Sequence, residues 1–204
     1  MLSTVIKRKI REFRQHLFTW GRKRARNFSW RRNPTLYRIL IAEFFLQRTK
    51  APQAEKQFRL FVRRYRNFPS LREVNLQELK KYLKPLGLEK RVGIFQKLIK
   101  VINEKYGGKV PNEYDDLIKL PGIGDYSASA IEVFALNRKK PLIDANTIRI
   151  FSQLLGKNIS REEGKHSALI RECALYFSSL GRDRRKANWL LLDYGSIIDK
   201  RRVN

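Results

Sequence analysis

Apolar residues recur every three or four positions through most of the sequence, and this spacing constrains the fold more than any other feature. Near the N-terminus the pattern runs through Ile6, Ile10, Phe13, Leu17 and Trp20. Such spacing predicts amphipathic helices, and no stretch alternates as a half-buried strand would. We therefore predict an all-α fold of roughly ten helices, arranged as two helical lobes with an active-site cleft between them.

Glycine, proline and asparagine indicate where these helices begin and end. Gly21 is expected to end the first helix, with a basic linker at 22–26, and Asn75 is expected to cap a short helix. Further helices are expected to begin near Pro34 and to span about 52–65, 76–83, 90–105, 115–120, 125–136, 144–155, 161–180 and 184–199. Residues 1–33 and 138–204 are expected to form one lobe, and residues 34–137 the other.

The charge balance indicates an anionic partner. The sequence has 45 Lys and Arg against 19 Asp and Glu, a net charge of +26. Such an excess repels itself in a compact fold unless an anion offsets it, and nucleic acid is the usual partner. An anionic membrane surface is one alternative. A thermophile-type charged surface is another, although such surfaces tend to balance Lys with Glu.

The sequence offers few residues for disulfide or metal chemistry. Cys173 is the single cysteine, so neither an internal disulfide nor a four-thiolate cluster can form, and we expect a buried small hydrophobe. His16 and His166 belong to no ligand-like group, and no metal site is predicted. No apolar run approaches the roughly 18 residues of a membrane span, and no secretory signal is visible. We expect an intracellular protein of the cytoplasm or nucleoid.

The segment 120–126 reads Leu-Pro-Gly-Ile-Gly-Asp-Tyr and lies between two predicted helices. Its glycines permit unusual backbone angles and close approach to another molecule. The helix that follows directs its free N–H groups at the turn, as phosphate sites do. Pro121, Gly122, Ile123 and Gly124 are therefore predicted to contact DNA backbone without reading sequence. An ordinary turn is the alternative for the pattern taken alone.

Three motifs in order resemble the helix-hairpin-helix (HhH-GPD) DNA glycosylase superfamily. In chain order they are Glu-Phe-Phe-Leu-Gln-Arg-Thr at 43–49, the hairpin at 120–126, and a hydrophobic-Asp-x-Asn motif at 143–146. The resemblance covers about Trp30 to Asp199 and is greatest to the thymine/uracil mismatch and adenine (MutY-type) glycosylases. It implies base excision repair, in which the enzyme hydrolyses the N-glycosidic bond of a base flipped out of the duplex.

The resemblance implies two catalytic carboxylates. Asp144 would stabilise positive charge that develops on the sugar and steer the nucleophile; the alternative is that it only caps its helix. Glu43 has apolar neighbours, which could keep its carboxyl protonated so that it donates to the departing base. A solvated charge on a helix face is the alternative for Glu43.

Tyr126 stands where endonuclease III-like relatives place a lysine. That lysine forms a Schiff base and then cleaves the strand, which a phenol cannot do. We therefore expect a monofunctional glycosylase, without AP-lyase activity, that leaves an intact abasic site. Tyr126 would pack against the flipped base or sugar; an ordinary buried aromatic residue is the alternative.

The resemblance also implies contacts with double-stranded DNA. Gln47 would fill the space left by the extruded base, and Arg48 would contact the opposite strand. Leu88 stands where relatives wedge a side chain into the duplex, in a loop about one residue shorter than usual. Lys139 and Lys140 look like phosphate contacts. The hairpin could hold a monovalent cation through backbone carbonyls, and we expect a monomer.

The sequence departs from many relatives after Ile198, where four cysteines usually hold a [4Fe–4S] cluster. Here residues 199–204 read Asp-Lys-Arg-Arg-Val-Asn, so either the member lacks a cluster or the sequence is truncated, and the basic tail could replace phosphate contacts. The extra C-terminal domain of adenine glycosylases is also missing. We therefore expect T or U opposite G as the substrate. Adenine opposite 8-oxoguanine or G is the first alternative, and a non-catalytic DNA-binding module is the second.

Overall fold

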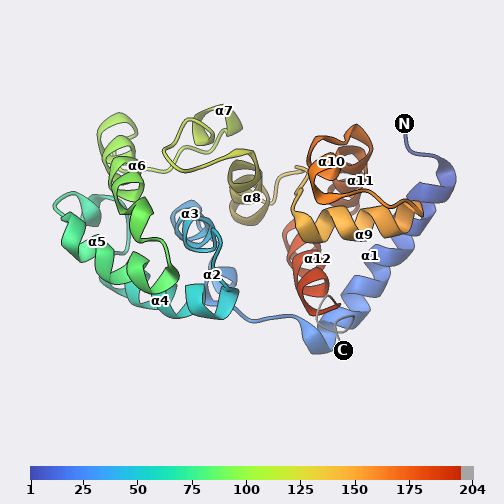
Figure 1. The fold of residues 1–204 in the computed structure, drawn as a ribbon, viewed down its shortest axis with the longest axis horizontal. Coiled ribbons are helices and arrows are strands. Elements are labelled where there is room, and N and C mark those ends of the chain that lie inside the picture. The colour runs from blue at the N-terminus through green and yellow to red at the C-terminus, as the bar shows by residue number, and fades with distance from the viewer. Residues whose placement is uncertain (199–204) are drawn as a thin grey trace. The chain divides into compact units, whose positions relative to one another are not determined.

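A computed structural model describes residues 1–198 of the chain, which are α-helical and contain no strand (Figure 1). The all-α prediction is therefore confirmed for these residues. The predicted helix end at Asp199 and the basic tail at 200–204 lie outside the described residues. The elements are α1 (Thr4–Arg24), α2 (Ser29–Arg32), α3 (Leu36–Phe45), α4 (Ala51–Arg64), α5 (Leu76–Leu83), α6 (Val92–Lys105), α7 (Tyr114–Leu117), α8 (Asp125–Leu136), α9 (Ala145–Leu155), α10 (Arg161–His166), α11 (Ala168–Ser179) and α12 (Arg184–Ile198), with short 3-10 helices η1 (Pro69–Leu71), η2 (Lys84–Leu86) and η3 (Glu89–Arg91).

The chain forms two compact units. Of the described residues, unit 1 consists of 1–26 and 137–198, and unit 2 of 27–136. The segment that precedes α3 belongs to unit 2, because Trp30 is buried and packs edge-on against Phe58, with ring centroids 5.4 Å apart. Unit 1 has a hydrophobic core of its own, which includes Leu17, Phe151 and Phe177.

In unit 1, α1 packs against α9, α11 and α12. The expectation that Gly21 ends the first helix is wrong, because α1 continues to Arg24 and is capped by Ala25. A Cβ at Gly21 would lie 2.4 Å from the Leu190 side chain. Glycine is needed there so that α1 can approach α12 closely, and it does not break the helix.

A second correction concerns the region expected to form one helix over 161–180. It contains two helices, α10 and α11, separated at Ser167. The Ser167 side chain accepts a hydrogen bond from Ile170 N–H at 3.3 Å and so caps the start of α11. Gly164 allows α10 to approach α9, because a Cβ there would lie 2.3 Å from Ile148.

Unit 2 is built around phenylalanine rings. Phe61 packs against Phe45 and Phe95, with ring centroids 5.3 and 5.7 Å away, and all three side chains are buried. Helix α3 is central to this unit: it packs against both α4 and α8 and buries every residue from 39 to 45. A helix that is buried on all sides provides a rigid support for the groups at its C-terminal end.

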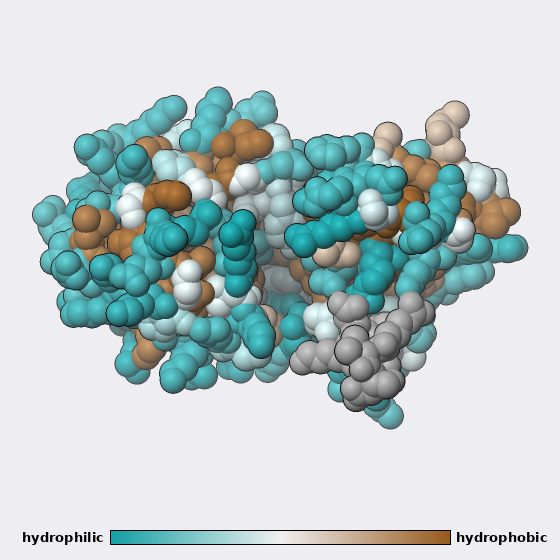
Figure 2. Space-filling view, in the orientation of Figure 1, coloured by the Kyte–Doolittle hydropathy of each residue, from teal (hydrophilic) through white to brown (hydrophobic). Residues whose placement is uncertain are grey.

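The surface of each unit is dominated by hydrophilic side chains in the view of Figure 2, with small, scattered hydrophobic patches. Among the described residues, no helix is both long enough and apolar enough to span a membrane.

Candidate active site

Glu43 lies near the C-terminal end of α3 and is only 8 % exposed. A solvated charge on a helix face is therefore excluded for this residue. Its neighbours Phe44 and Phe45 are fully buried. A buried carboxyl group is costly unless it is hydrogen-bonded or neutral, so its burial sets Glu43 apart from the surface carboxylates.

The hairpin connects α7 and α8, and α8 spans 125–136 as the sequence predicts. Backbone hydrogen bonds close the turn: Leu120 N–H donates to Leu117 at 3.1 Å, and Ile123 N–H donates to Leu120 at 3.1 Å. Ile123 is buried, whereas Gly124 and Asp125 are exposed at the start of α8. The exposed part of the hairpin is thus the beginning of α8, and the N-terminus of a helix attracts anions.

The two hairpin glycines lie in different surroundings. Gly122 has φ +80°, and a Cβ there would lie 2.8 Å from the Phe44 ring and 2.9 Å from Ile94. Gly124 has no positive φ, and a Cβ there would meet nothing within 4 Å. Gly122 therefore allows the turn to pack on α3 and α6, whereas Gly124 leaves space on the exposed side of the turn.

The carbonyl of Gly122 is held by two side chains from other segments of unit 2. Gln47 Nε2 donates to it at 2.9 Å, and an Arg91 terminal nitrogen lies 3.5 Å away. The Arg91 guanidinium also stacks 5.2 Å from the centroid of the Phe44 ring. Burial lowers the pKa of Arg91, and nearby Arg48 lowers it further. Sequence reasoning did not assign Arg91, because only the folded chain brings it to the hairpin.

Arg48 and Leu88 occupy very different environments. Arg48 is exposed and has φ +57°, a left-handed conformation that is uncommon for residues other than glycine. Such strain persists where the surroundings impose it, often at ligand sites. Leu88 is only 4 % exposed and so does not project as a wedge in this structure. A hydrogen bond links the segment that contains Arg48 to the segment that contains Leu88, since the Thr49 hydroxyl donates to the Leu86 carbonyl at 3.0 Å.

Asp144 lies in unit 1, at the N-cap of α9. One carboxylate oxygen accepts from Thr147 N–H at 2.8 Å, and the Asp144 N–H donates to the Thr147 hydroxyl at 2.8 Å. This reciprocal pair is a capping box. The capping interpretation is therefore correct, but it uses one carboxylate oxygen and leaves the second for other contacts.

The second carboxylate oxygen of Asp144 is oriented by a short chain of hydrogen bonds. Asn146 Nδ2 donates to it at 3.3 Å, and Arg149 donates to Asn146 Oδ1 at 3.3 Å. Arg149 also donates to the Gly195 carbonyl of α12 at 2.7 Å. A Cβ at Gly195 would lie 2.6 Å from the Asn146 side chain. The orientation of Asp144 thus depends on α12, which the sequence did not reveal.

The remaining predicted residues divide between the two units. Tyr126 is half-buried in the first turn of α8, in unit 2 with Glu43, Gln47 and the hairpin. Pro121 is also half-buried in the turn. Lys139, which is exposed, and Lys140 lie in unit 1, in the segment that leads to Asp144.

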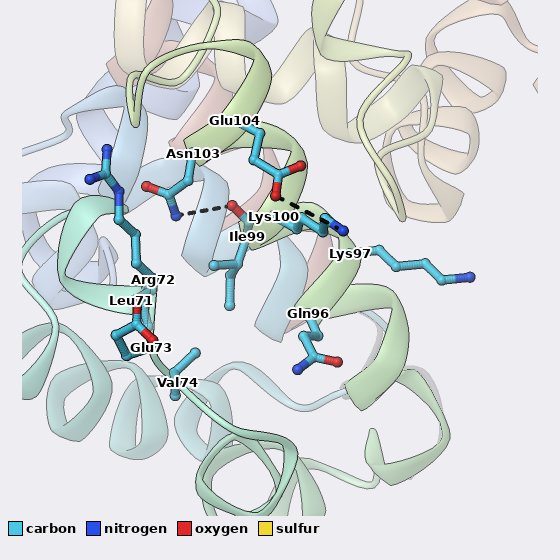
Figure 3. A pocket seen from close by; sticks show the side chains of 10 residues that line it. All are labelled: Leu71, Arg72, Glu73, Val74, Gln96, Lys97, Ile99, Lys100, Asn103 and Glu104. Carbon is cyan, nitrogen blue, oxygen red and sulfur yellow. Dashed lines mark hydrogen bonds and ion pairs between the residues drawn. The ribbon is translucent and has the colours of Figure 1, made fainter.

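A cavity of about 600 Å³ lies in unit 2 between the segment 71–74 and α6 (Figure 3). Its lining is mostly polar and charged, and Lys100 pairs with Glu104 at 3.9 Å. Asn103 Nδ2 donates to the Ile99 carbonyl at 3.0 Å. None of the predicted site residues lines this cavity. The residues predicted to form the active site therefore lie elsewhere than this cavity.

The residues present do not fit an iron–sulfur cluster. Such a cluster is held by several thiolates, whereas the sequence has Cys173 alone. Cys173 is buried in α11, and burial raises its pKa to about 11. Among residues 1–198, no group of three or more His, Cys, Asp or Glu side chains could hold a metal ion.

The chain is similar to DNA glycosylases along most of its length. It is 36% identical over 152 residues to a thymine-DNA glycosylase of Aeropyrum pernix, covering 74% of this chain and 68% of that one. It is 30% identical over 197 residues to a thymine/uracil-DNA glycosylase of Methanothermobacter thermautotrophicus, covering 96% and 87%. An adenine DNA glycosylase of Buchnera aphidicola is 35% identical over 148 residues, but these cover only 42% of it. No protein-family model matches the chain.

Solved structures show the same fold. A thermostable thymine-DNA glycosylase superposes with a TM-score of 0.81 and 26% identity, covering 93% of this chain and 87% of that one. A trapped endonuclease III–DNA intermediate gives 0.75 with 20% identity, covering 97% and 88%. On the relatives that match most of its length, the chain belongs to the helix-hairpin-helix DNA glycosylase family, which includes the thymine/uracil-DNA glycosylases.

Proposed function

We propose that this protein is a monofunctional mismatch glycosylase, which removes thymine or uracil opposite guanine and leaves an intact abasic site. The observation that carries the proposal is the 197-residue similarity to a thymine/uracil-DNA glycosylase, which extends over both units. The phenol of Tyr126 at the start of α8 supports the absence of strand cleavage, because it cannot form a Schiff base.

Asp144 acts on the sugar. Loss of the base builds positive charge on the deoxyribose, and a fixed carboxylate stabilises that charge without reorganising. The Asp144 oxygens are held by Thr147 and Asn146 before any substrate arrives. Such preorganisation is the feature that makes an electrostatic contribution large.

Glu43 acts on the base. Its burial in α3 keeps water away from the carboxyl group, which donates a proton or a hydrogen bond to the departing pyrimidine. Tyr126 packs against the flipped nucleotide. Gln47 fills the space left behind, and Arg48 contacts the opposite strand. Leu88 is buried in this structure and is given no role as a wedge. The hairpin residues, Lys139 and Lys140 hold the DNA backbone.

The test uses four duplexes that carry G·T, G·U, A·8-oxoguanine and A·G. Each is incubated with the protein and analysed with and without alkali, which breaks the strand at an abasic site. We expect alkali-dependent breaks at G·T and G·U, and none without alkali. Breaks with none of the four duplexes refute base removal, and breaks without alkali refute the monofunctional assignment.

Asp144→Asn is the matched catalytic variant. Asparagine caps a helix as well as aspartate does, so the fold should be retained. We expect base release to fall by at least about 100-fold, because the stabilising charge is lost, while DNA binding persists. A fully active variant refutes the role of Asp144.

An adenine glycosylase is the second candidate. It is favoured by the 35% identity to an adenine DNA glycosylase over 148 residues and by the segment 43–49, which fits both groups. The four-duplex experiment separates the candidates, because this one predicts breaks at A·8-oxoguanine or A·G alone.

A further inference from the structure

Asn137 connects two basic segments of unit 1. Its side-chain Nδ2 donates to the Arg182 carbonyl at 2.8 Å, and its Oδ1 accepts from Arg185 N–H at 2.9 Å. Asn137 itself has φ +56°, one of only two positive values at non-glycine residues within 1–198. The amide therefore fixes the segment 181–186 beside the segment that begins at residue 137. This segment, called the loop below, consists of the turn after α11 and the first residues of α12.

The loop is also held from its other side. Arg184 N–H donates to the Arg182 carbonyl at 3.0 Å, and Asn188 Nδ2 donates to the Arg184 carbonyl at 2.9 Å. Gly181 has φ +67° at the start of the loop. A loop fixed by this many bonds loses little conformational entropy when it binds a ligand.

Exposed cations are concentrated on these two segments. Lys139, Arg182 and Lys186 are exposed, and none forms an ion pair with a carboxylate among residues 1–198. Asp183 is the one acidic residue of the loop. The cations outnumber this single carboxylate; like charges repel one another, and a bound anion relieves that repulsion.

Further donors lie beneath the loop. Arg14 Nη2 lies 3.4 Å from the position of a Cβ at Gly181. Arg14 Nε and Nη2 are buried and have no hydrogen-bond acceptor among the described residues. The guanidinium of Arg14 and the ammonium of Lys186 both lie over the Phe18 ring, at 4.8 and 5.6 Å from its centroid. A cavity of about 350 Å³ is lined by Arg14, Phe18 and the loop residues Arg182 and Asp183.

We propose that Arg182 and Lys186, together with Lys139, form a second binding surface for the phosphodiester backbone of duplex DNA, on unit 1 and additional to the hairpin of unit 2. We call it the loop surface. It rests on the proposed function only in taking duplex DNA as its ligand. Phosphodiester oxygens match these cations better than an acidic protein segment does, because within this loop surface no exposed apolar side chain is available to anchor a peptide.

The loop surface predicts a change in the salt dependence of binding. Affinity for an undamaged duplex is measured by fluorescence anisotropy over a range of salt concentrations. Each phosphate contact contributes about 0.9 to the slope of log affinity against log salt. Arg182→Ala/Lys186→Ala should therefore lower the slope by about 1.8.

The matched control is Lys157→Ala/Arg161→Ala. These cations are also exposed and in unit 1, and the variant loses the same charge. The control should keep the wild-type slope. Equal slopes for the two double variants would overturn the proposal, whether both stay at the wild-type value or both fall.

Asn137→Gly tests separately the two hydrogen bonds by which the Asn137 side chain fixes the loop. Glycine tolerates the positive φ, and the formal charge is unchanged. Binding should weaken because the loop is no longer fixed, and wild-type affinity in this variant would refute the role given to Asn137. Binding is measured on undamaged duplex, so it does not depend on base removal. If the wild-type protein releases no base but the loop and control variants still differ in slope, the proposed function is refuted and the loop surface is not.

Discussion

Replacing the two hairpin glycines one at a time separates folding from DNA binding. In Gly122→Ala, the new Cβ lies 2.8 Å from the Phe44 ring and 2.9 Å from Ile94, both closer than real contacts allow. The residue must also adopt φ +80°. A left-handed conformation costs alanine about 1–2 kcal/mol, and overpacking a core costs about 1–3 kcal/mol. We expect a loss of about 3 kcal/mol in the free energy of unfolding.

Gly124→Ala is the control. Its Cβ meets nothing within 4 Å, and its φ is not positive, so the stability should be unchanged or slightly higher. The same Cβ projects from the exposed side of the turn, where we propose that DNA backbone approaches. Binding of undamaged duplex should therefore weaken in Gly124→Ala.

The assays are thermal unfolding followed by circular dichroism, and anisotropy with a labelled duplex. For a chain of this size, 1 kcal/mol corresponds to about 2–4 °C, so Gly122→Ala should melt about 6–12 °C below the wild type. Equal melting temperatures for Gly122→Ala and the wild type would refute the packing argument. Unchanged DNA affinity in Gly124→Ala would refute the assigned direction of DNA approach.

Three further predictions concern other parts of the chain. Arg149→Met removes the donor to the Asn146 side chain and the Gly195 carbonyl, which orient Asp144. It should slow base release at saturating DNA more than it weakens DNA binding; single-turnover rates and anisotropy check this, and an unchanged rate contradicts it. Tyr126→Lys should give a borohydride-trappable complex with the abasic product if an amine there reaches the sugar; no trapped complex would mean that residue 126 does not face it. Burial raises the pKa of Cys173 to about 11 from 9.0, so this thiol's contribution to stability is present below about pH 9 and is lost as pH rises toward 11. Denaturant titrations of the wild type and Cys173→Ala across pH 8–11 measure it, and identical pH dependence in the two proteins counts against it.

Local signals in the sequence predicted several elements closely. Helix α8 spans 125–136 as expected, and Asn75 caps α5 through a 2.9 Å bond to Glu78 N–H. Both depend on residues only a few positions apart. Ser167 carries the same kind of signal, a serine directly before an apolar helical run, and this could have revealed the break between α10 and α11.

Features set by distant contacts were not predictable from one sequence. Gly21 resembles a helix stop, but its small size serves packing against Leu190, which is far away along the chain. Arg91 and Gly195 have no motif of their own, and each acquires a role only when folding brings it to Gly122 or to Asn146. Motifs can therefore point to Glu43 and Asp144, but not to the side chains that hold them in place.

The bond between Gln47 and the Gly122 carbonyl has a consequence for how DNA is searched. If Gln47 enters the duplex when a base leaves, its amide must first release the hairpin. A neutral hydrogen bond is worth about 1 kcal/mol, so this release sets a small threshold. At undamaged pairs, whose bases cost more free energy to extrude, the bond between Gln47 and the Gly122 carbonyl would stay intact. It would break only at a weakened pair, where the lower cost of extruding the base offsets the loss of the bond.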